Sequence, residues 1–279
     1  MTRNTLQPNR LLAAIALTTG LTAGSLFAAD TLDTSGARLL TTTAVQDEAA
    51  PELADNSSFF SLSGWEGSFA LGMNGASGNN ENFNARAGME ARKETDRNEA
   101  TLGFAYTYAT SDGTESANRF VAAARYDWLF PDSKWRVFAI GSYEYDEFQD
   151  WDHRVSLGPG VGYQAIKTDD TDLLLRAALL GTREFGGSDD KWITELNPGL
   201  DFEHKITERQ TFVSSLDFYS NLDDPNNYRF VGAAAWRIEM DPEAGLFLEL
   251  GIEDRYDSNP GTGFKKNDFA YFATVGWSF

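Results

Sequence analysis

The last twelve residues, Asp268 to Phe279, read DFAYFATVGWSF and predict a β-strand. Every second position from Phe269 onward is apolar, and most of the positions between them are small or polar. A period of two places successive side chains on opposite faces of a strand. The apolar face carries aromatic rings near both ends and small or aliphatic residues between them. This distribution is typical of a strand that crosses a bilayer, where rings lie at the level of the headgroups.

The aromatic residues of this stretch also predict how the chain is assembled. Tyr271, Trp277 and the final residue, Phe279, lie on the same face of the predicted strand. This arrangement resembles the carboxyl-terminal signal by which bacterial outer-membrane barrels are recognised for assembly. We therefore expect these three residues to act as an assembly signal, with the barrel-assembly machinery as a partner.

The composition excludes several kinds of site. The 279 residues include no Cys, so neither a disulfide framework nor a Cys metal site is possible. The formal net charge of -19 argues against nucleic-acid binding, because a surface that binds phosphates needs an excess of Lys and Arg. No cofactor is predicted.

The first 63 residues predict export rather than a folded domain. Residues 1–29 read as a secretory signal peptide, with Arg3 and Arg10 ahead of an apolar run and small residues at the cleavage point. A transmembrane anchor is the alternative, but the run is short and interrupted by Thr and Gly. Residues 30–63 combine Thr, Ala and acidic residues with few large apolar ones, so we expect a flexible periplasmic linker. A short helix that partly plugs a lumen is the alternative for this segment.

From residue 64 to residue 279 the alternating pattern recurs about every 15 to 20 residues, separated by clusters of Gly, Asp, Asn and Pro. One such segment places Phe120 and Trp128 on the face opposite Arg125 and Asp127. The pattern predicts about twelve strands, and bacterial single-chain barrels use an even number. A closed barrel is favoured because an open sheet edge in lipid leaves backbone groups unpaired. Residues 64–279 are therefore predicted to form an all-β, transmembrane antiparallel β-barrel in the bacterial outer membrane.

The connections between the predicted strands favour one orientation. Those on the periplasmic side are expected to be short: 94–98, 131–134, 167–170, 205–208 and 241–244. Those on the external side are expected to be longer, apart from the first hairpin turn at 78–81. The longer external loops are expected at 110–116, 148–152, 185–190, 222–227 and 257–267. This orientation collects aromatic residues at both ends of the strands. A soluble β-protein, which is the competing fold, has no reason to collect them there.

The polar face of the predicted strands points into an enclosed, wet lumen. Buried charges must be paired or hydrated, so facing Arg and carboxylate side chains either hold a narrow lumen closed or line a small aqueous path. A packed polar core and a conducting pore are both compatible with this pattern. The residues predicted to line the lumen are Arg86, Glu90, Arg125, Asp127, Glu144, Arg154, Arg176, Glu195, Asp201, Asp217, Arg229, Arg237 and Glu239.

Two prolines fall in the middle of predicted strands. Pro159 and Pro198 are each flanked by Gly, and proline cannot donate to the hydrogen bonds of a sheet. We expect a local bulge or bend near each. The pattern leaves open whether these are deliberate deformations of the wall or tolerated irregularities.

Several short blocks of the sequence resemble a known family. They are GWEG at 64–67, SGN at 77–79, YEYD at 143–146, GPGVGY at 158–163 and REF at 183–185. These blocks resemble the YdiY-like family of salt-induced outer-membrane proteins, a domain of unknown function. The resemblance covers roughly residues 64–279. It implies an outer-membrane location and a link to salt or osmotic stress, and it carries no catalytic residues.

Catalytic or metal chemistry is not predicted. His153 and His204, the two histidines of the chain, fall at opposite ends of the predicted barrel, so one pocket cannot hold both. Nucleophilic catalysis needs a base within reach of the nucleophile and a third group to orient it. The acid pairs at 189–190 and 223–224 match no recognised cation-binding loop, and we interpret them as solvated loop residues.

The sequence therefore predicts an outer-membrane β-barrel, surrounded by lipid, that forms a narrow channel for small hydrophilic solutes or ions. The alternative is a non-conducting envelope protein that acts structurally or through its acidic loops during osmotic stress.

Overall fold

The computed structural model describes residues 64–78, 81–187 and 190–279. The predicted signal peptide, 1–29, and the predicted linker, 30–63, lie outside these residues, so neither prediction is tested. The described ranges contain no helix with the length and apolar character needed to cross a membrane. The strands are β1 (Glu66–Ala76), β2 (Asn82–Glu94), β3 (Asn98–Ser111), β4 (Thr114–Leu129), β5 (Trp135–Asp146), β6 (His153–Lys167), β7 (Thr171–Phe185), β8 (Trp192–Thr207), β9 (Gln210–Asn221), β10 (Tyr228–Asp241), β11 (Leu246–Asp257) and β12 (Asn267–Ser278).

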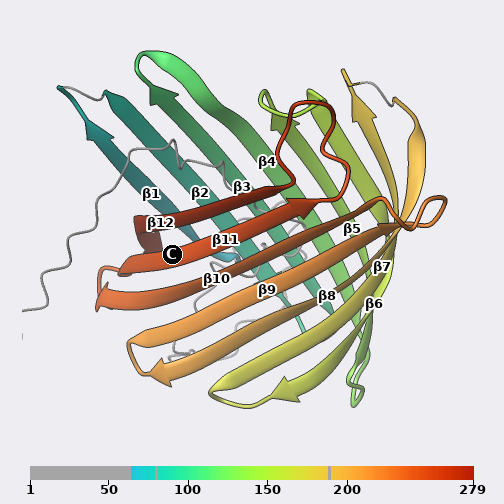
Figure 1. Ribbon diagram of the computed structural model, residues 1–279. Coiled ribbons are helices and arrows are strands. Elements are labelled where there is room, and N and C mark those ends of the chain that lie inside the picture. The colour runs from blue at the N-terminus through green and yellow to red at the C-terminus, as the bar shows by residue number, and fades with distance from the viewer. Residues whose placement is uncertain (1–63, 79–80, 188–189) are drawn as a thin grey trace, which may run out of the picture.

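These strands form a closed antiparallel barrel in which each strand pairs with its neighbours in the chain (Figure 1). Strand β12 returns to pair with β1 and closes the ring. The predicted fold class is therefore confirmed. Closure matters physically because it leaves no complete strand edge without a partner.

The side chains alternate as the sequence predicts. In β4, for example, Val121, Ala123 and Arg125 point inward and are buried, whereas Ala122 and Trp128 point outward. The outer surface exposes many large apolar side chains, including Leu157 with 60% of its area exposed. The barrel thus has an apolar outer surface and a largely polar interior, which is the reverse of a soluble protein.

The two ends of the barrel differ in their connections. At one end, which we name the turn end, residues 95–97, 130–134, 168–170, 208–209 and 242–245 connect the strands. At the opposite end, the loop end, most connections are longer and the longest is 258–266.

One predicted loop is wrong. Residues 110–116 were expected to form a longer external loop, but β3 and β4 are joined by the two residues Asp112 and Gly113. Both have positive φ angles, 51° and 74°. Asp-Gly is the favoured sequence for such a two-residue hairpin because both positions need φ above zero. The dipeptide itself carried the signal for a tight turn.

A bulge or a bend was expected near each mid-strand proline, and the structure shows an interrupted pairing at each without a bulge. The pairing register of β6 with β7 is the same on both sides of Pro159, and that of β8 with β9 is the same on both sides of Pro198. Near Pro198, the Nδ2 of Asn197 donates a 3.2 Å hydrogen bond to the carbonyl of Phe218. Near Pro159, Gly158 lets the carbonyl of Leu179 approach so closely that a Cβ would lie 2.0 Å from it. The sheet therefore accommodates each proline locally, without shifting its strands.

The carboxyl terminus closes the barrel at the turn end. The backbone groups of Gly67 and Phe279 exchange two hydrogen bonds of 2.9 and 2.8 Å, and the ring of Trp277 stacks on Phe69 with centroids 5.2 Å apart. The predicted assembly residues Trp277 and Phe279 thus lie at the closing contact, and Tyr271 lies farther up β12 with its side chain exposed outside.

Candidate functional site

The lumen is the candidate site, and its charged side chains gather in two layers. All thirteen residues predicted to line it fall on the inward-facing positions of their strands. Most of them are buried. Because a buried charge is costly unless it is paired, each of these side chains needs a partner of opposite charge.

The first layer, the turn-end layer, is centred on Arg176 of β7. Its guanidinium contacts Asp201 of β8 at 3.1 Å and Asp217 of β9 at 2.6 Å. Arg125 of β4 contacts Asp127 at 2.8 Å and reaches Asp201 at 3.3 Å. Since β4 and β8 are four strands apart in the ring, this last contact crosses the lumen.

The second layer, the loop-end layer, is centred on Glu144 of β5. Arg119 of β4 pairs with Glu144, and Arg255 of β11 donates to the same carboxylate at 2.9 Å. Strands β5 and β11 are six apart in a ring of twelve, so Arg255 spans the lumen from the opposite wall. Beside this crossing, Arg154 pairs with Glu184 at 2.5 Å.

An apolar cluster lies between the two layers. Phe138, Ile140, Leu180 and Tyr219 are all at most 2% exposed and pack together on the inner face. Along β5 and β7 they fall between the residues of the turn-end layer and those of the loop-end layer. The inner face is therefore not polar throughout on this side, because apolar packing lies between the two charged layers. This packing also explains why the apolar Leu180 shares a face of β7 with Arg176.

Strands β4 to β9 form what we name the crowded half of the lumen, and β1 to β3 with β10 to β12 form the small-residue half. The inward positions of the small-residue half include a set of small side chains: Ser68, Ala70, Gly72, Gly88, Gly103, Ala105, Ala233, Ala235, Gly251, Thr274 and Gly276. Large inward side chains of this half, among them Glu90, Arg237 and Glu249, are buried between them.

The large aromatic side chains of the small-residue half lie against glycines. Phe272 is directly opposite Gly251, and Phe247 is directly opposite Gly276. A Cβ on either glycine would lie only 2.2 or 2.3 Å from the facing ring. The outer face of each ring therefore occupies the space that a side chain on the neighbouring strand would fill.

An arginine covers the lumen side of each of these rings. The guanidinium of Arg86 lies 4.1 Å from the centroid of Phe272, and that of Arg237 lies 4.3 Å from the centroid of Phe247. Glycine, ring and guanidinium form a stack whose last contact is a cation–π interaction. These stacks hold the large residues flat along the wall.

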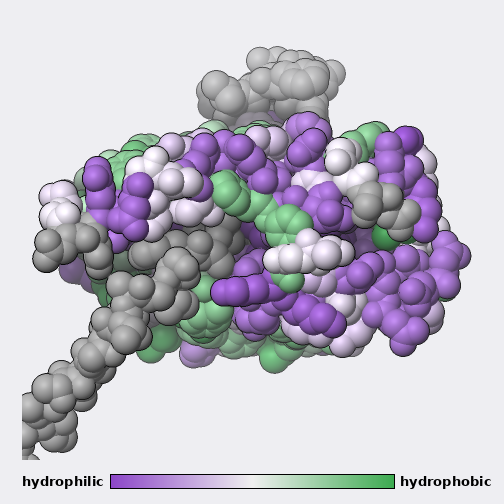
Figure 2. All heavy atoms as spheres, turned by 45° about the horizontal axis from the view of Figure 1, so that its top comes forward, coloured by the Kyte–Doolittle hydropathy of each residue, from purple (hydrophilic) through white to green (hydrophobic). Residues whose placement is uncertain are grey.

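A cavity of about 430 Å³, which we name the vestibule, opens at the loop end above the loop-end layer. Its lining is strongly polar and mixed in charge, and it includes Arg154, Glu184, Lys191, Glu195, Arg229 and Asp257. Figure 2 views the molecule toward this end and shows hydrophilic side chains gathered there, with hydrophobic ones along the flanks. Arg229 pairs with Glu195 at 2.8 Å, so part of the lining is already fixed by an ion pair.

Several residues of the two layers were missed by the sequence analysis. Glu99 and Arg136 join the turn-end layer, and Arg119, Asp146 and Arg255 join the loop-end layer. Each has the inward parity of its strand, so extending the two-residue period to the strand ends would have found them. Of the predicted residues, Arg86, Glu90, Arg237 and Glu239 lie on β2 and β10, outside the two layers.

The histidines and acids have no shared site. The Nδ1 of His153 contacts the hydroxyl of Tyr143 at 2.9 Å near the loop end, whereas His204 contacts Thr171 near the turn end. Across the described ranges, no group of three or more His, Asp or Glu side chains is arranged to hold a metal ion.

A protein-family model matches residues 69–279, which include almost the whole barrel. It describes a protein of unknown function, DUF481. The chain belongs to the DUF481 family. No curated protein matches the sequence significantly.

Solved structures with a similar fold include porins, channels and autotransporter barrels, all of low sequence identity. A KdgM porin is 12% identical, with a TM-score of 0.43, and the match covers 77% of this chain and 99% of that porin. A NanC porin is 13% identical, with a TM-score of 0.46, over 77% and 98% of the two chains. The outer-membrane channel DcaP of Acinetobacter baumannii is 9% identical, with a TM-score of 0.39, over 77% and 96%.

Proposed function

We propose that the protein is a bacterial outer-membrane barrel that gives small hydrophilic solutes or ions a narrow path through the membrane. The outer surface supports the membrane location. Contiguous apolar patches on soluble proteins rarely exceed a few hundred Å². Here the exposed apolar side chains include Leu71, Leu179, Leu196 and Ile252, which come from strands all around the ring. Such a surface is stable when lipid covers it.

The ends of the barrel support an orientation with the loop end outside the cell. Barrels of this class have short periplasmic turns and longer external loops. Rings also collect at both ends, as membrane interfaces favour. Trp135 and Tyr163 pack 5.0 Å apart near the turn end, and Tyr228 and Tyr256 pack 5.7 Å apart near the loop end.

The vestibule is the observation that carries the channel proposal. A cavity of about 430 Å³ is large enough for a small hydrated ion or a small polar molecule. Its floor is formed by the loop-end layer, where Arg154 and Arg229 face Glu184 and Glu195. A mixed-charge constriction favours small polar solutes over apolar ones and selects between ions by charge. The path continues past Arg255, which spans the lumen to Glu144 and narrows it.

Planar-bilayer recordings on the purified protein test this proposal. We expect small, steady conductance steps, and we expect Arg255→Gln to enlarge them because it removes the side chain that spans the lumen to Glu144. Arg183→Gln is the matched control, since Arg183 points outward and pairs with Asp190 at the surface. Absence of conductance above background in the wild type and in Arg255→Gln contradicts the channel.

The second candidate is a non-conducting envelope protein, and the crowded half favours it. The contact of Arg125 with Asp201 crosses the lumen, and Phe138 and Leu180 pack beside it. If this role is correct, Arg125→Gln lowers heat resistance in detergent and leaves conductance at background. A channel instead changes its ion selectivity when Arg125 is neutralised.

Further proposals concern the activity, the partners and the physiological role of the barrel. We propose no enzymatic activity, lipid as the surrounding partner, and recognition of Tyr271, Trp277 and Phe279 by the assembly machinery. We also propose a link to salt or osmotic stress, on the family resemblance alone. Truncating the last residue tests the assembly step, because the unassembled chain accumulates in the periplasm. Transcript levels at raised osmolarity test the stress link, and unchanged levels contradict it.

A further inference from the structure

The barrel is not evenly closed. Strand β1 pairs with β12 over four residue pairs, from Ser68 with Ser278 to Leu71 with Val275. Every other neighbouring pair of strands is joined by 10 to 14 residue pairs. Above Leu71 and Val275, each strand keeps only its other neighbour, so the wall is split toward the loop end. Figure 1 shows β1 and β12 running in different directions there.

The burial of β1 changes where the split begins. From Ser68 to Leu71 the strand alternates between buried inward and exposed outward side chains. From Met73 to Ala76 every residue is exposed, including Asn74, which occupies an inward position. Beyond Leu71 no residue of β12 pairs with β1, so Asn74 lacks the cover that a neighbouring strand would give it on that edge.

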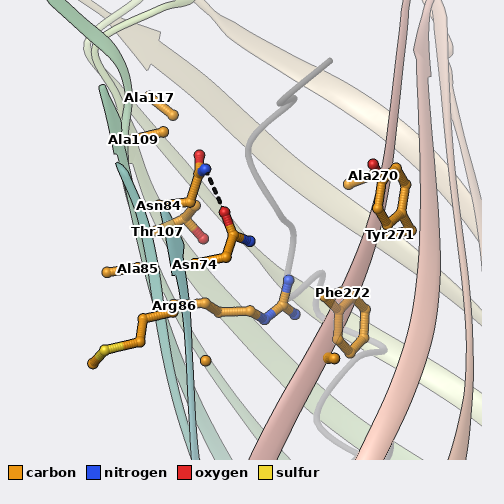
Figure 3. A pocket seen from close by; sticks show the side chains of 13 residues that line it. Asn74, Asn84, Ala85, Arg86, Thr107, Ala109, Ala117, Ala270, Tyr271 and Phe272 are labelled. Carbon is orange, nitrogen blue, oxygen red and sulfur yellow. Dashed lines mark hydrogen bonds between the residues drawn. The ribbon is translucent and has the colours of Figure 1, made fainter. Parts of the chain in front are cut away.

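A cavity of about 90 Å³, which we name the seam gap, lies in this split (Figure 3). Its lining includes Met73 and Tyr271, whose side chains point to the outer surface, and Asn74, Arg86 and Phe272, whose side chains point inward. Alternation places these two sets on opposite faces, and both include residues from the parts of β1 and β12 that no longer pair with each other. The seam gap therefore lies between the unpaired parts of the two strands, between the outer apolar surface and the lumen.

The seam gap has an apolar side and a polar side. Met73 is 77% exposed and Tyr271 is 64% exposed, which makes them the two most exposed large apolar side chains of the described residues. On the lumen side, Asn84 donates a 2.8 Å hydrogen bond to the Oδ1 of Asn74, and Arg86 extends toward Phe272. Arg86 is the single charged residue among those that line the cavity in the described part of the chain. The lining thus favours an anionic group inside and an apolar chain outside.

The depth of the split places it in the outer half of the membrane. Five residues separate Gly67, at the turn-end contact with Phe279, from Gly72, where the split begins. At about 3.3 Å per residue and a tilt of about 40°, this is a rise of roughly 13 Å. The apolar band of such barrels is about 25 Å tall. Backbone without a partner at this depth is tolerated where it lines a polar cavity.

We propose that the seam gap is a lateral binding site for a single-chain amphiphile with an anionic head. The head lies in the lumen against the guanidinium of Arg86 and the amide of Asn74. The acyl chain passes between β1 and β12 and lies on the outer surface beside Met73 and Tyr271. A volume of about 90 Å³ equals roughly three water molecules, which suits the polar end of one chain and not a lipid with two chains. The site goes beyond the proposed channel and does not depend on conduction.

The test uses the full mature chain in lipid nanodiscs and two probes of the same chain length. One is palmitate carrying a diazirine on its chain, and the other is the corresponding neutral alcohol. We expect palmitate to label peptides of β1 and β12 at least fivefold more than peptides of β5 to β8, and the alcohol to label all of them evenly. Even labelling by both probes indicates ordinary surrounding lipid and overturns the proposal.

Two arginine variants sharpen the test. Arg86→Gln is expected to weaken palmitate binding about tenfold, as loss of a charge-assisted contact does, without changing labelling by the alcohol. Arg237→Gln is the matched control, because Arg237 also faces the lumen and covers a glycine-docked ring but lies away from the seam gap. A heat-dependent gel shift shows that each variant is folded. An equal loss of palmitate binding in the two folded variants overturns the proposal. Disulfide-linked dimers of a Met73→Cys variant, in a chain that has no other Cys, would instead assign the split edges to a second copy of the chain, and would also overturn it.

Discussion

The two halves of the lumen are built on the same alternating wall, yet they are filled in opposite ways. In the crowded half, large side chains project away from the wall, and Arg125 crosses to Asp201. In the small-residue half, Phe247 and Phe272 lie flat against Gly276 and Gly251. An inward charge or ring by itself therefore does not fill the lumen of a barrel. A side chain lies along the wall when the neighbouring strand offers a glycine for it to lie against. It closes the lumen when it meets a partner on a strand across the lumen.

The largest effect is expected in the turn-end layer of the crowded half. Arg176→Met removes the partner of Asp201 and Asp217, and leaves two buried carboxylates with less compensation. Breaking one partner from a buried network costs about 3–5 kcal/mol. Urea unfolding in detergent micelles, followed by Trp fluorescence, measures this loss of unfolding free energy.

The control for this prediction is Arg183→Gln. Arg183 and Asp190 form a 2.7 Å ion pair, but both side chains are at least one third exposed. An exposed pair contributes about 0–1 kcal/mol. Equal losses in the two variants contradict a structural role for the turn-end layer.

The next effect concerns the small-residue half. Gly276→Ala places a Cβ where the ring of Phe247 lies, at 2.3 Å, so the ring must move into the lumen. Overpacking of this kind costs about 1–3 kcal/mol, and we expect conductance to fall together with stability. Gly141→Ala is the control, because its nearest neighbouring atom would be 3.8 Å away. A stable variant with unchanged conductance means that the ring does not need the glycine.

A smaller effect is expected at the proline of the crowded half. Asn197→Ala removes the amide that donates to the carbonyl of Phe218 and to the carboxylate of Asp217. Loss of a buried hydrogen bond costs about 1 kcal/mol. Hydrogen exchange of the amides in β8 and β9 near Pro198 measures the local opening, and protection equal to the wild type contradicts the compensation.

The smallest effect is expected at the vestibule. Lys191→Gln removes one positive charge from the lining. The permeability ratio of cations to anions should rise by about twofold at low salt and return to the wild-type ratio near 1 M salt, where charges are screened within about 3 Å. Reversal potentials across a salt gradient measure this ratio, and a shift toward anions contradicts the assignment of Lys191 to the path.

Much of the fold could be predicted from the sequence because alternation is local. The residues from 120 to 128 reveal which side chains face inward without any knowledge of the neighbouring strands. The same reasoning placed Arg125, Arg154 and Arg229 in the lumen, where the structure has them. It failed at residues 110–116, where the Asp-Gly turn was overlooked, and it did not predict the apolar cluster that Leu180 joins on the inner face.

The sequence by itself determined a twelve-stranded wall, its two faces and its closing strand, since each depends on a period of two within one segment. The tertiary structure alone decided that Arg255 meets Glu144, that Phe247 meets Gly276, and that β1 leaves β12 after four residue pairs. These facts depend on register and on closure, which join residues as many as 210 positions apart, Ser68 and Ser278. A period of two fixes the face on which a side chain lies, but not the residue that it meets across a strand or across the lumen.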